Sequence, residues 1–433
     1  MGNTHKDNES GLNLIGKIPE SWMICRLGKI GTFSASGIDK KISDKEKPIH
    51  IINYTDVYGN SSHELCQKEY MLVSAPAEKC IEHQVEQGDM IFTPSSETID
   101  DIGVSAVVME NIPNTAYSYH VLRYRSNVID NHFKKYVCNN AVVQNYFSSR
   151  ATGSIRKTLC RQDFKDCKVI LPPNKEQIAI GKYLDDLCSN INSLILLQEQ
   201  MIKDLQSYKI SYILKCVTKG IRTDIDLKES DVDWIGMIPK TWSVAKFKNL
   251  FRIKKDIAGE LGYDVLSVTQ KGLKIKDLTK NEGQLAQDYS KYQLVAKEDF
   301  VMNHMDLLTG FVDLSVYEGV TSPDYRTFRT INYNIVDNHY YLKIFQICYW
   351  TRLFYNLGQG VSTLGRWRLP AEQQNNFMLP VPPLDEQKEI ADHLDKKMQQ
   401  IDSLIAIKQE KIQELKNYRK SIIYEYVTGK KRV

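Results

Sequence analysis

The chain has 433 residues, 42% of them hydrophobic and 25% charged, a composition typical of a globular protein with two or three domains. Its 57 Lys and Arg against 53 Asp and Glu give a net charge of +4, which permits binding to nucleic acid without requiring it. The longest apolar run, at 194–197, is far shorter than the roughly 18 residues of a membrane-spanning helix, and the first residues are polar. We therefore expect neither a membrane protein nor an exported one. The nine cysteines are odd in number, scattered along the chain and without a Cys-x-x-Cys motif, which indicates reduced thiols in the cytoplasm.

The sequence contains a tandem repeat, and a repeat decides the fold more strongly than any local pattern. An Ile-Pro-x-x-Trp motif ends at Trp22 and returns ending at Trp242. A Pro-Pro-x-x-Glu-Gln motif ends at Gln177 and returns ending at Gln387. From there the two copies align without a gap to a Val-Thr pair that closes each of them. The sequence therefore predicts a duplicated unit.

The middle of the repeat has diverged while its ends have been kept. Residues 26–165 and 246–375 share little beyond a faint skeleton, such as Gly88–Phe92 against Glu298–Met302. We infer that the kept parts meet a common partner and that the diverged parts meet different ones.

Local patterns predict that each diverged stretch is an α+β domain of about 140 residues. Short β-branched and aromatic runs between turn residues predict strands at 50–54, 90–93, 104–109, 265–268 and 311–317. Helices are predicted at 133–147 and 340–353.

Two long helices are predicted after the Pro-Pro motifs, over 182–219 and 384–428, which contain no Gly or Pro. Their apolar residues fall on alternating three- and four-residue steps, the pattern of a coiled-coil seam. The predicted seam residues are Leu184, Ile191, Leu194, Leu205 and Tyr208 in the first helix, and Leu394, Ile401, Leu404, Leu415 and Tyr418 in the second. Gly220 and Gly429 follow the predicted helix ends, and each rod should be about 60 Å long.

This order of motifs, present twice, resembles the specificity subunits of type I restriction–modification systems. The resemblance covers residues 12–430, with small departures at Lys240-Thr241 and Leu384-Asp385. It implies an α+β chain in which two globular target recognition domains are separated by two long antiparallel coiled-coil helices in a pseudo-twofold internal repeat. Each domain would read one half of a bipartite, asymmetric DNA target. The helices would set the gap between the halves and dock methyltransferase subunits through residues of the seam.

The resemblance also divides the chain into six segments. These are 1–24, the N-terminal segment of repeat 1; 25–170, target recognition domain 1; 171–220, spacer helix 1; 221–244, a linker and the start of repeat 2; 245–380, target recognition domain 2; and 381–433, spacer helix 2 with a basic tail.

The motifs of an enzyme are absent from the sequence. No Gly-x-x-x-x-Gly-Lys-Ser/Thr loop for ATP is found, and neither 171–174 nor 381–384 has the order of a methyltransferase Asn/Asp-Pro-Pro-aromatic loop. Glu386-Gln387-Lys388 has a nuclease-like spacing but opens a helix. We therefore expect a non-catalytic chain without a cofactor of its own. The implied partners are double-stranded DNA and two methyltransferase subunits carrying S-adenosylmethionine, in phage defence. Whether two restriction (translocase and nuclease) subunits are recruited stays open.

One pattern has the spacing of a metal site. His63 and Cys66 are followed by Cys80 and His83, two pairs of ligands of the kind that hold structural zinc. However, Cys80 alternates with apolar neighbours as a core thiol would, and the second repeat has no counterpart. The sequence therefore favours no metal.

DNA reading requires cations for phosphates and Asn, Gln, Ser, Thr or Arg for base edges, mounted on loops. The candidates in the first domain are Lys40, Lys41, Asn53, Tyr54, Thr55, Thr93, Ser95, Ser96, Ser154, Arg156 and Lys157. Those in the second are Lys254, Lys255, Thr269, Gln270, Lys271, Asn303, His304, Ser362, Arg366 and Arg368. Arg156 and Arg366 hold equivalent places ahead of the long helices, which favours both. For any single candidate, an ordinary solvated loop residue is the alternative.

Two other hypotheses stay open from the sequence. A fused restriction–modification polypeptide with its own activity would need a catalytic domain, for which the duplication leaves little room. A coiled-coil scaffold whose domains bind protein would show only weak affinity for DNA, indifferent to sequence.

Overall fold

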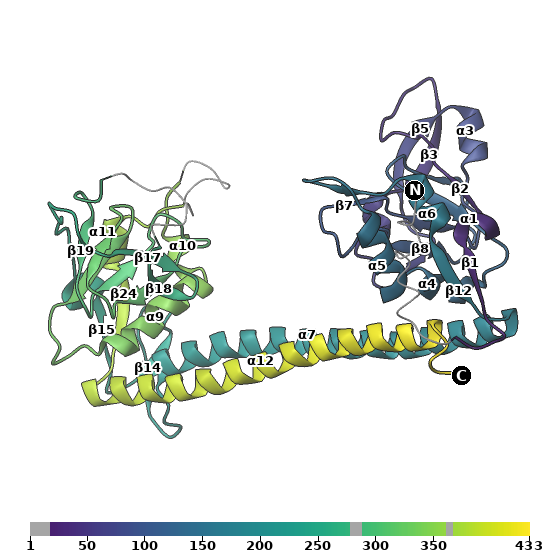
Figure 1. Ribbon diagram of the computed structural model, residues 1–433. Helices are drawn as coiled ribbons and strands as arrows, with labels where there is room; N and C mark the ends of the chain where they lie inside the picture. Colours follow the sequence, from purple (N-terminus) through teal and green to yellow (C-terminus); the bar gives the residue numbers. More distant parts are fainter. Residues whose placement is uncertain (1–17, 278–287, 361–366) are drawn as a thin grey trace, which may run out of the picture. The chain divides into compact units, whose positions relative to one another are not determined.

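The computed structural model describes residues 18–277, 288–360 and 367–433 (Figure 1). The chain forms two compact units: unit 1 comprises Met1–Glu199 with Glu410–Val433, and unit 2 comprises Gln200–Gln409. Each unit therefore combines one diverged domain with the first part of its own long helix and the last part of the other repeat's helix.

Unit 1 contains a five-stranded and a three-stranded sheet. The larger has the order β2-β10-β6-β8-β4, with bounds β2 Thr32–Ser34, β10 Leu122–Arg125, β6 Met90–Phe92, β8 Ser105–Val108 and β4 Glu64–Leu65. The smaller has the order β5-β3-β9, with β5 Met71–Ala75, β3 Lys47–Ile52 and β9 Thr115–Tyr117. Strands β6 and β8 are buried along their whole length, which explains why Ser105 is the one polar residue in them, and the strands predicted at 90–93 and 104–109 are confirmed.

Two short pairings and six short helices complete the domain of unit 1. Strand β1 pairs with β12, and β7 with β11, over Met23–Arg26 with Lys168–Leu171 and Ser95–Ser96 with Lys157–Thr158. The helices are α1 Leu27–Ile30, α2 Tyr54–Val57, α3 Ala77–Glu82, α4 Asn131–Val137, α5 Ala141–Arg150 and α6 Arg161–Asp166. The single helix predicted at 133–147 is two helices, because the Asn140 side chain accepts hydrogen bonds from Val142 N and Val143 N and so starts α5 afresh.

Unit 2 contains two four-stranded sheets. One has the order β16-β23-β20-β21, with β16 Phe251–Ile253, β23 Arg326–Thr330, β20 Phe300–Met302 and β21 Val312–Leu314. The other has the order β18-β17-β22-β19, with β18 Gly272–Ile275, β17 Val265–Thr269, β22 Gly319–Thr321 and β19 Gln293–Val295. The remaining elements are the pairs β13 Leu227–Glu229 with β14 Met237–Pro239 and β15 Ser243–Lys246 with β24 Met378–Val381, and helices α8 Phe247–Leu250, α9 Asn338–Trp350, α10 Leu353–Asn356 and α11 Ala371–Asn376.

The two domains share one framework despite their unlike sequences. The order β2-β10-β6-β8 of unit 1 corresponds to β16-β23-β20-β21 of unit 2. The second sheet of each unit contains a parallel pairing, β3 with β9 in unit 1 and β17 with β22 in unit 2. Aromatic rings fill the cores: Phe92 contacts Phe164 in unit 1, and Phe300 stacks on Phe328 in unit 2. Burying each such ring contributes about 1.5–3 kcal/mol. The α+β prediction is confirmed in both units.

The long helices are α7, Asn174–Lys219, and α12, Leu384–Val427, shown in teal and yellow in Figure 1. The end predicted for α12 is correct to one residue, but α7 begins eight residues before the predicted start, and Gly181 lies inside it. A Cβ at Gly181 would come within 2.7 Å of His132 Cβ, so this glycine lets α4 approach the helix closely. Gly220 and Gly429 have φ of +74° and +73°, as expected past helix ends. Within the described residues, no helix has an 18-residue stretch apolar enough to cross a membrane.

The two helices pack antiparallel within each unit. In unit 1, the Tyr183 and Tyr426 rings are 4.9 Å apart, and Asn192 is hydrogen-bonded to Arg419 further along. In unit 2, Lys209 contacts Asp402 at 2.6 Å, and Tyr212 Oη lies 2.8 Å from His393 Nε2. In both pairs of contacts the residue numbers rise on α7 as they fall on α12.

The structure corrects part of the predicted seam. Five of its residues are buried or half-buried on the inner faces as expected from their spacing: Leu184, Ile191, Leu205, Leu394 and Ile401. Leu415 is half-buried as well. Four are instead 46–54% exposed: Leu194, Tyr208, Leu404 and Tyr418. The seam passes through the next residue, Ile195, which is 7% exposed, because a four-residue step from Ile191 keeps it on the inner face.

Candidate nucleic-acid interface

A tryptophan attaches each diverged domain to its long helix. In unit 1, Trp22 Nε1 donates to Glu176 Oε2 at 3.0 Å, and in unit 2, Trp242 Nε1 donates to Glu386 Oε2 at 2.9 Å. Both indole rings are at most 5% exposed. The Ile-Pro-x-x-Trp and Pro-Pro-x-x-Glu-Gln motifs are therefore the two halves of one contact, made twice.

The glutamine of the second motif makes the other half of this attachment. Gln177 Oε1 accepts from Asp130 N at 2.9 Å, while its Nε2 donates to Pro172 O at 2.9 Å. Gln387 repeats both bonds, to Asp337 N at 2.8 Å and to Pro382 O at 2.9 Å. We call the Trp–Glu and Gln contacts together the hooks. They hold the start of α4 or α9 against the helix, so the domain is fixed to it.

Three predicted DNA-reading residues of unit 1 are buried. Asn53 caps α2 and accepts from Ser118 Oγ, Thr93 Oγ1 donates to Val104 O, and Ser96 Oγ accepts from Thr98 N. Their polar groups are used inside the fold, so the structure corrects their assignment to direct contact with DNA. They position the loops that follow them.

The other candidates of unit 1 are exposed or half-buried: Lys40, Lys41, Tyr54, Thr55, Ser95, Ser154, Arg156 and Lys157. The structure brings three of their loops together. The Arg156 guanidinium lies 5.5 Å from the centre of the Tyr54 ring, a cation–π contact. The antiparallel pairing of β7 with β11 places Lys157 opposite Ser96 and Thr158 opposite Ser95, so the loops that carry these residues lie side by side.

His120 joins these loops to the Lys40 loop. Burial lowers the pKa of His120, and the positive charges of Lys40 and Arg156 lower it further. The neighbouring Tyr119, 47% exposed, has its ring centre 3.8 Å from that of His120. We call Lys40, Tyr54, Ser95, His120 and Arg156 the unit 1 loop cluster. The sequence missed Tyr119 and His120 because their partners are far away along the chain.

In unit 2, the two candidate lysines, Lys254 and Lys255, lie in different environments. Lys254 contacts Asp299 at 2.5 Å and Asp256 at 3.6 Å and is half-buried, so its charge is neutralised within the fold. The structure therefore corrects its assignment as a phosphate contact. Lys255 is exposed.

The turn between β17 and β18 carries three further candidates. Thr269 faces Gly272 in the β17–β18 pairing, so Gln270 and Lys271 form the exposed turn between them. Thr269 Oγ1 donates to Gly272 O at 2.9 Å, which fixes the turn. Gln270 Nε2 donates to the Thr309 carbonyl and so ties the turn to the loop after β20.

That loop brings Asn303 and His304 next to Arg368. Burial lowers the pKa of His304 to about 3, and the charges of Arg326 and Arg368 lower it further, so the imidazole is neutral at pH 7. Its Nδ1 has no hydrogen-bond partner among the described residues. We call Gln270, Asn303, His304 and Arg368 the unit 2 loop cluster. Arg368 is exposed and closes a loop by bridging to Gln359, as Thr158 bridges to Thr152 in unit 1. Ser362 and Arg366 lie outside the described residues.

The residues with metal-like spacing have other contacts. His63 Nδ1 lies 3.0 Å from Ser105 O, and burial lowers the pKa of His63 to about 4. His83 Nδ1 lies 3.3 Å from Tyr117 Oη, and Cys80 packs on the small core cluster around Ile49. In the part of the chain that the structure describes, no group of three or more His, Cys, Asp and Glu side chains could hold a metal ion.

Comparison with known proteins identifies the family. The family model described as the type I restriction modification DNA specificity domain matches residues 19–203 and again 239–417, most of both repeats. This chain belongs to that family. The resemblance inferred from the motifs is thereby confirmed, and neither the fused enzyme nor the protein-binding scaffold gains support.

Two relatives come from the archaeon Methanocaldococcus jannaschii. One, named provisionally as the type I restriction enzyme MjaX specificity subunit, is 24% identical over 97% of this chain and 96% of its own length. The type I restriction enzyme MjaVIII specificity subunit is 26% identical over 67% of this chain and 68% of its own length.

Two solved structures share the fold. A chain from a study of complex assembly and conformational transition in the type I R-M system has a TM-score of 0.69 and 15% identity, covering 95% of this chain and 99% of that one. The HsdS subunit of Thermoanaerobacter tengcongensis has a TM-score of 0.52 and 16% identity, covering 95% and 98%.

Proposed function

We propose that each diverged domain of this specificity-family chain reads one half of a bipartite, asymmetric DNA target through its loop cluster. The observation that carries the proposal is that each cluster places a cation among groups able to recognise base edges, on a domain whose hooks are the same in both repeats. Cations fix a protein on the phosphates, and amide, hydroxyl and imidazole groups discriminate bases. Because the two clusters differ in their residues, the two half-sites should differ in sequence.

The same proposal leaves methyl transfer to partner subunits. The chain itself would be non-catalytic and hold no cofactor. Two methyltransferase subunits would supply S-adenosylmethionine, restriction subunits would join through them, and the complex would act on DNA in the cytoplasm. The support for this assignment is membership of a DNA specificity family, together with the absence of ATP-binding and methyltransferase motifs from the sequence.

We propose the exposed apolar side chains of the long helices as the docking surface for those subunits. Leu194 and Leu404 are 47% and 48% exposed at equivalent positions of the repeat, and Tyr208 and Tyr418 are 46% and 54% exposed at another. Large apolar side chains exposed at matching places mark a surface that another protein covers. Their repetition suits two copies of one partner.

Single-residue variants test the assignment of unit 1. We expect Arg156→Ala, in the full chain with its methyltransferase, to weaken DNA binding by about 1–3 kcal/mol and to relax sequence preference in one half-site only. The readouts are binding to an oligonucleotide of the target at fixed salt and the genome-wide methylated motif. The control is Lys29→Ala, which removes a positive charge from exposed α1 in the same unit.

The reciprocal variant in unit 2 completes the test. Arg368→Ala should relax the other half-site and leave the first intact. If either variant relaxed both halves equally, or changed no more than Lys29→Ala, the loop clusters would not be the reading surfaces.

A further inference from the structure

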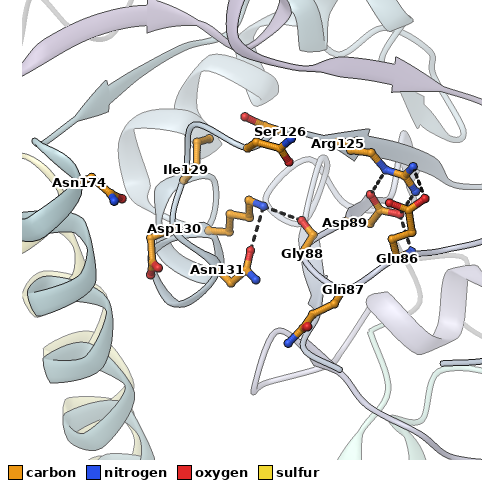
Figure 2. Close-up of a pocket in the computed structure, with 12 residues that line it drawn as sticks. Glu86, Gln87, Gly88, Asp89, Arg125, Ser126, Ile129, Asp130, Asn131 and Asn174 are labelled. Atoms are coloured by element: carbon orange, nitrogen blue, oxygen red, sulfur yellow. Dashed lines mark hydrogen bonds and ion pairs between the residues drawn. The ribbon is translucent and has the colours of Figure 1, made fainter. Parts of the chain in front are cut away.

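Unit 1 contains a polar pocket of about 340 Å³ that the DNA-reading role does not use (Figure 2). Its lining includes Gly88, Asp89, Arg125, Asp130, Asn131 and Lys134. None of these belongs to the unit 1 loop cluster. Two charged members of the lining are almost fully buried, Asp89 at 1% and Lys134 at 3% exposed. Asp89 is paired with Arg125, so the lysine is the unusual member.

The buried ammonium of Lys134 has only neutral partners. Its Nζ donates to Gly88 O at 2.7 Å and to Asn131 Oδ1 at 3.0 Å, the two dashed lines that meet at one nitrogen in Figure 2. An ammonium has three donors, so one is left over. Among the described residues no carboxylate forms an ion pair with it. Burial lowers the pKa of Lys134 to about 8, although the charges of Asp89 and Asp130 act to raise it.

The carboxylates that line the pocket already accept hydrogen bonds from other groups. Asp89 accepts from Arg125 Nε and Nη2 at 2.7 Å each, and Glu86 accepts from Arg125 Nη1 at 2.6 Å (Figure 2). Asp130 caps α4 by accepting from His132 N and Phe133 N. Each acid therefore satisfies another group, and the pocket supplies no counterion to Lys134.

Unit 2 shows what occupies the equivalent place. An Asp-Asn-His sequence begins at 130 and at 337, so Asn338 is the counterpart of Asn131. The turn before β6 and β20 is also shared, because Gly88 N donates to Val108 O at 2.7 Å and Glu298 N donates to Ser315 O at 2.8 Å. Glu298 thus stands where unit 1 has Gly88. Its carboxylate accepts from Asn338 Nδ2 at 3.0 Å.

The repeat that has a glutamate at this turn fills the site with its own carboxylate. The repeat that has Gly88 carries no side chain at the turn, and the ends of Asn131 and Lys134 lie against the glycine instead. The counterpart of that lysine, Tyr341, donates to Pro380 O. A non-glycine residue is tolerated at the turn, since Glu298 has φ of +67° where Gly88 has +89°.

We propose that the unit 1 pocket is a binding site for a carboxylate, which accepts from Lys134 Nζ and Asn131 Nδ2 beside the turn that carries the Glu298 side chain in unit 2. The carboxylate comes from a small free acid or from an acidic side chain of a bound subunit. A cation is disfavoured, because the buried ammonium would repel it. The proposal does not depend on how the loop clusters read DNA.

The first experiment is thermal unfolding of the full chain with sodium acetate exchanged for sodium chloride at constant ionic strength, up to about 0.5 M. We expect acetate to raise the unfolding midpoint of the natural chain in a saturable way. Lys134→Met, which removes the charge at similar size, should abolish the shift. An absent shift, or an equal one in Lys134→Met, would overturn the proposal.

The second experiment supplies the carboxylate from the chain. Gly88→Glu and Gly88→Gln strain the turn alike, and a Cβ there would meet Asn131 Oδ1 at 2.6 Å and Lys134 Nζ at 3.1 Å, both at the ends of side chains that can move. We expect Gly88→Glu to unfold at a higher temperature than Gly88→Gln at pH 7 and to be insensitive to acetate. Equal midpoints for the two variants would contradict a carboxylate site.

A third measurement identifies the source of the carboxylate. Assembly of the Gly88→Glu chain with its methyltransferase, compared with that of the natural chain, should be weakened at least tenfold if an acidic side chain of that subunit enters the pocket. Unchanged assembly, with the acetate effect present, assigns the site to a free acid.

Discussion

The hooks and the loop clusters lie in the same two domains but compare very differently between the repeats. The Trp–Glu bonds measure 3.0 and 2.9 Å, and the glutamine bonds to the aspartate amides measure 2.9 and 2.8 Å. Both loop clusters have a cation near a histidine and draw on the loop after β6 or β20 and on the loop ahead of the long helix, but the side chains on these loops differ. The contacts that attach each domain to its helix are thus the same in both repeats, whereas the loops that we propose to read DNA differ.

The physical reason lies in burial. Gln177 and Gln387 are at most 3% exposed, and a buried amide that loses a partner costs roughly 1–3 kcal/mol, so few other residues can replace them. Exposed side chains such as Lys40 and Arg368 are solvated in any rotamer, and their replacement leaves the fold intact. A repeat can therefore acquire a new specificity at its loops without disturbing the hooks.

The strongest test of this separation is an exchange of whole domains. Replacing residues 26–165 with the equivalent domain of a relative, with Trp22, Glu176 and Gln177 left in place, should change one half-site completely and leave the other unchanged. Specific recognition is typically worth about 4–10 kcal/mol over non-specific binding, so the change in the methylated motif should be complete. Loss of specificity at both halves would show that the domains do not read independently.

Removal of a hook should cost stability equally in both repeats. Trp22→Ala and Trp242→Ala each delete a buried indole and a hydrogen bond, and each should lower the free energy of unfolding by about 3–5 kcal/mol in urea titrations. Trp22→Phe keeps most of the packing and should cost less. A large effect in one repeat with a small one in the other would mean that the hooks are not equivalent.

The pH dependence of stability should distinguish the two units at Lys134. Its pKa is lowered to about 8 in the folded chain, so the unfolded state binds the extra proton above that pH. Stability contributed through Lys134 therefore rises from pH 8 towards its ordinary pKa, by up to about 3 kcal/mol. The measurement is the difference in unfolding free energy between the natural chain and Lys134→Met at pH 7 and pH 10; a difference that does not change with pH would contradict it.

The smallest expected change concerns the gap between half-sites. Duplicating Ile191-Asn192-Ser193-Leu194 adds about one turn and roughly 6 Å to α7, or one to two base pairs. Four residues are a stutter in the seam, so some stability should be lost too. The half-site sequences should stay as they are, as they should in the control Ser193→Ala. If the variant is active and the gap in its methylated motif is unaltered, the helices do not set the spacing.

The sequence predicted the features that depend on periodicity and on the repeat. The end of α12, the buried strands β6 and β8, and the family all followed from residues near each other or from the internal copy. Contacts between distant segments were not predictable. The absence of Gly and Pro over 182–219 placed the start of α7 after Gly181, whereas this glycine lies inside the helix and allows the close approach of His132, a residue far away in the chain.

The candidate reading residues show the same limit. A serine or threonine on a loop has one sequence signature whether its hydroxyl faces water or a buried carbonyl, as with Thr93 and Val104 O. Lys254 likewise gave no sign that Asp299 would neutralise it. His120 was not a candidate because only the fold brings it close enough to Lys40 and Arg156 for their charges to lower its pKa.

The composition of the units has a consequence for biosynthesis. Unit 2 is one continuous stretch that ends at Gln409, whereas unit 1 needs Glu410–Val433 as well as the first half of the chain. A Cβ at Gly429 would lie 2.5 Å from Pro19 Cδ, so the last turn of α12 closes against the start of the first repeat. On the ribosome, where domains generally fold as they emerge, unit 2 should be complete first although its domain is translated second. The first domain to be translated cannot complete its unit until residues 410–433 have been made. A premature stop codon after 409 should therefore destabilise the N-terminal domain, in unit 1, rather than the domain of unit 2.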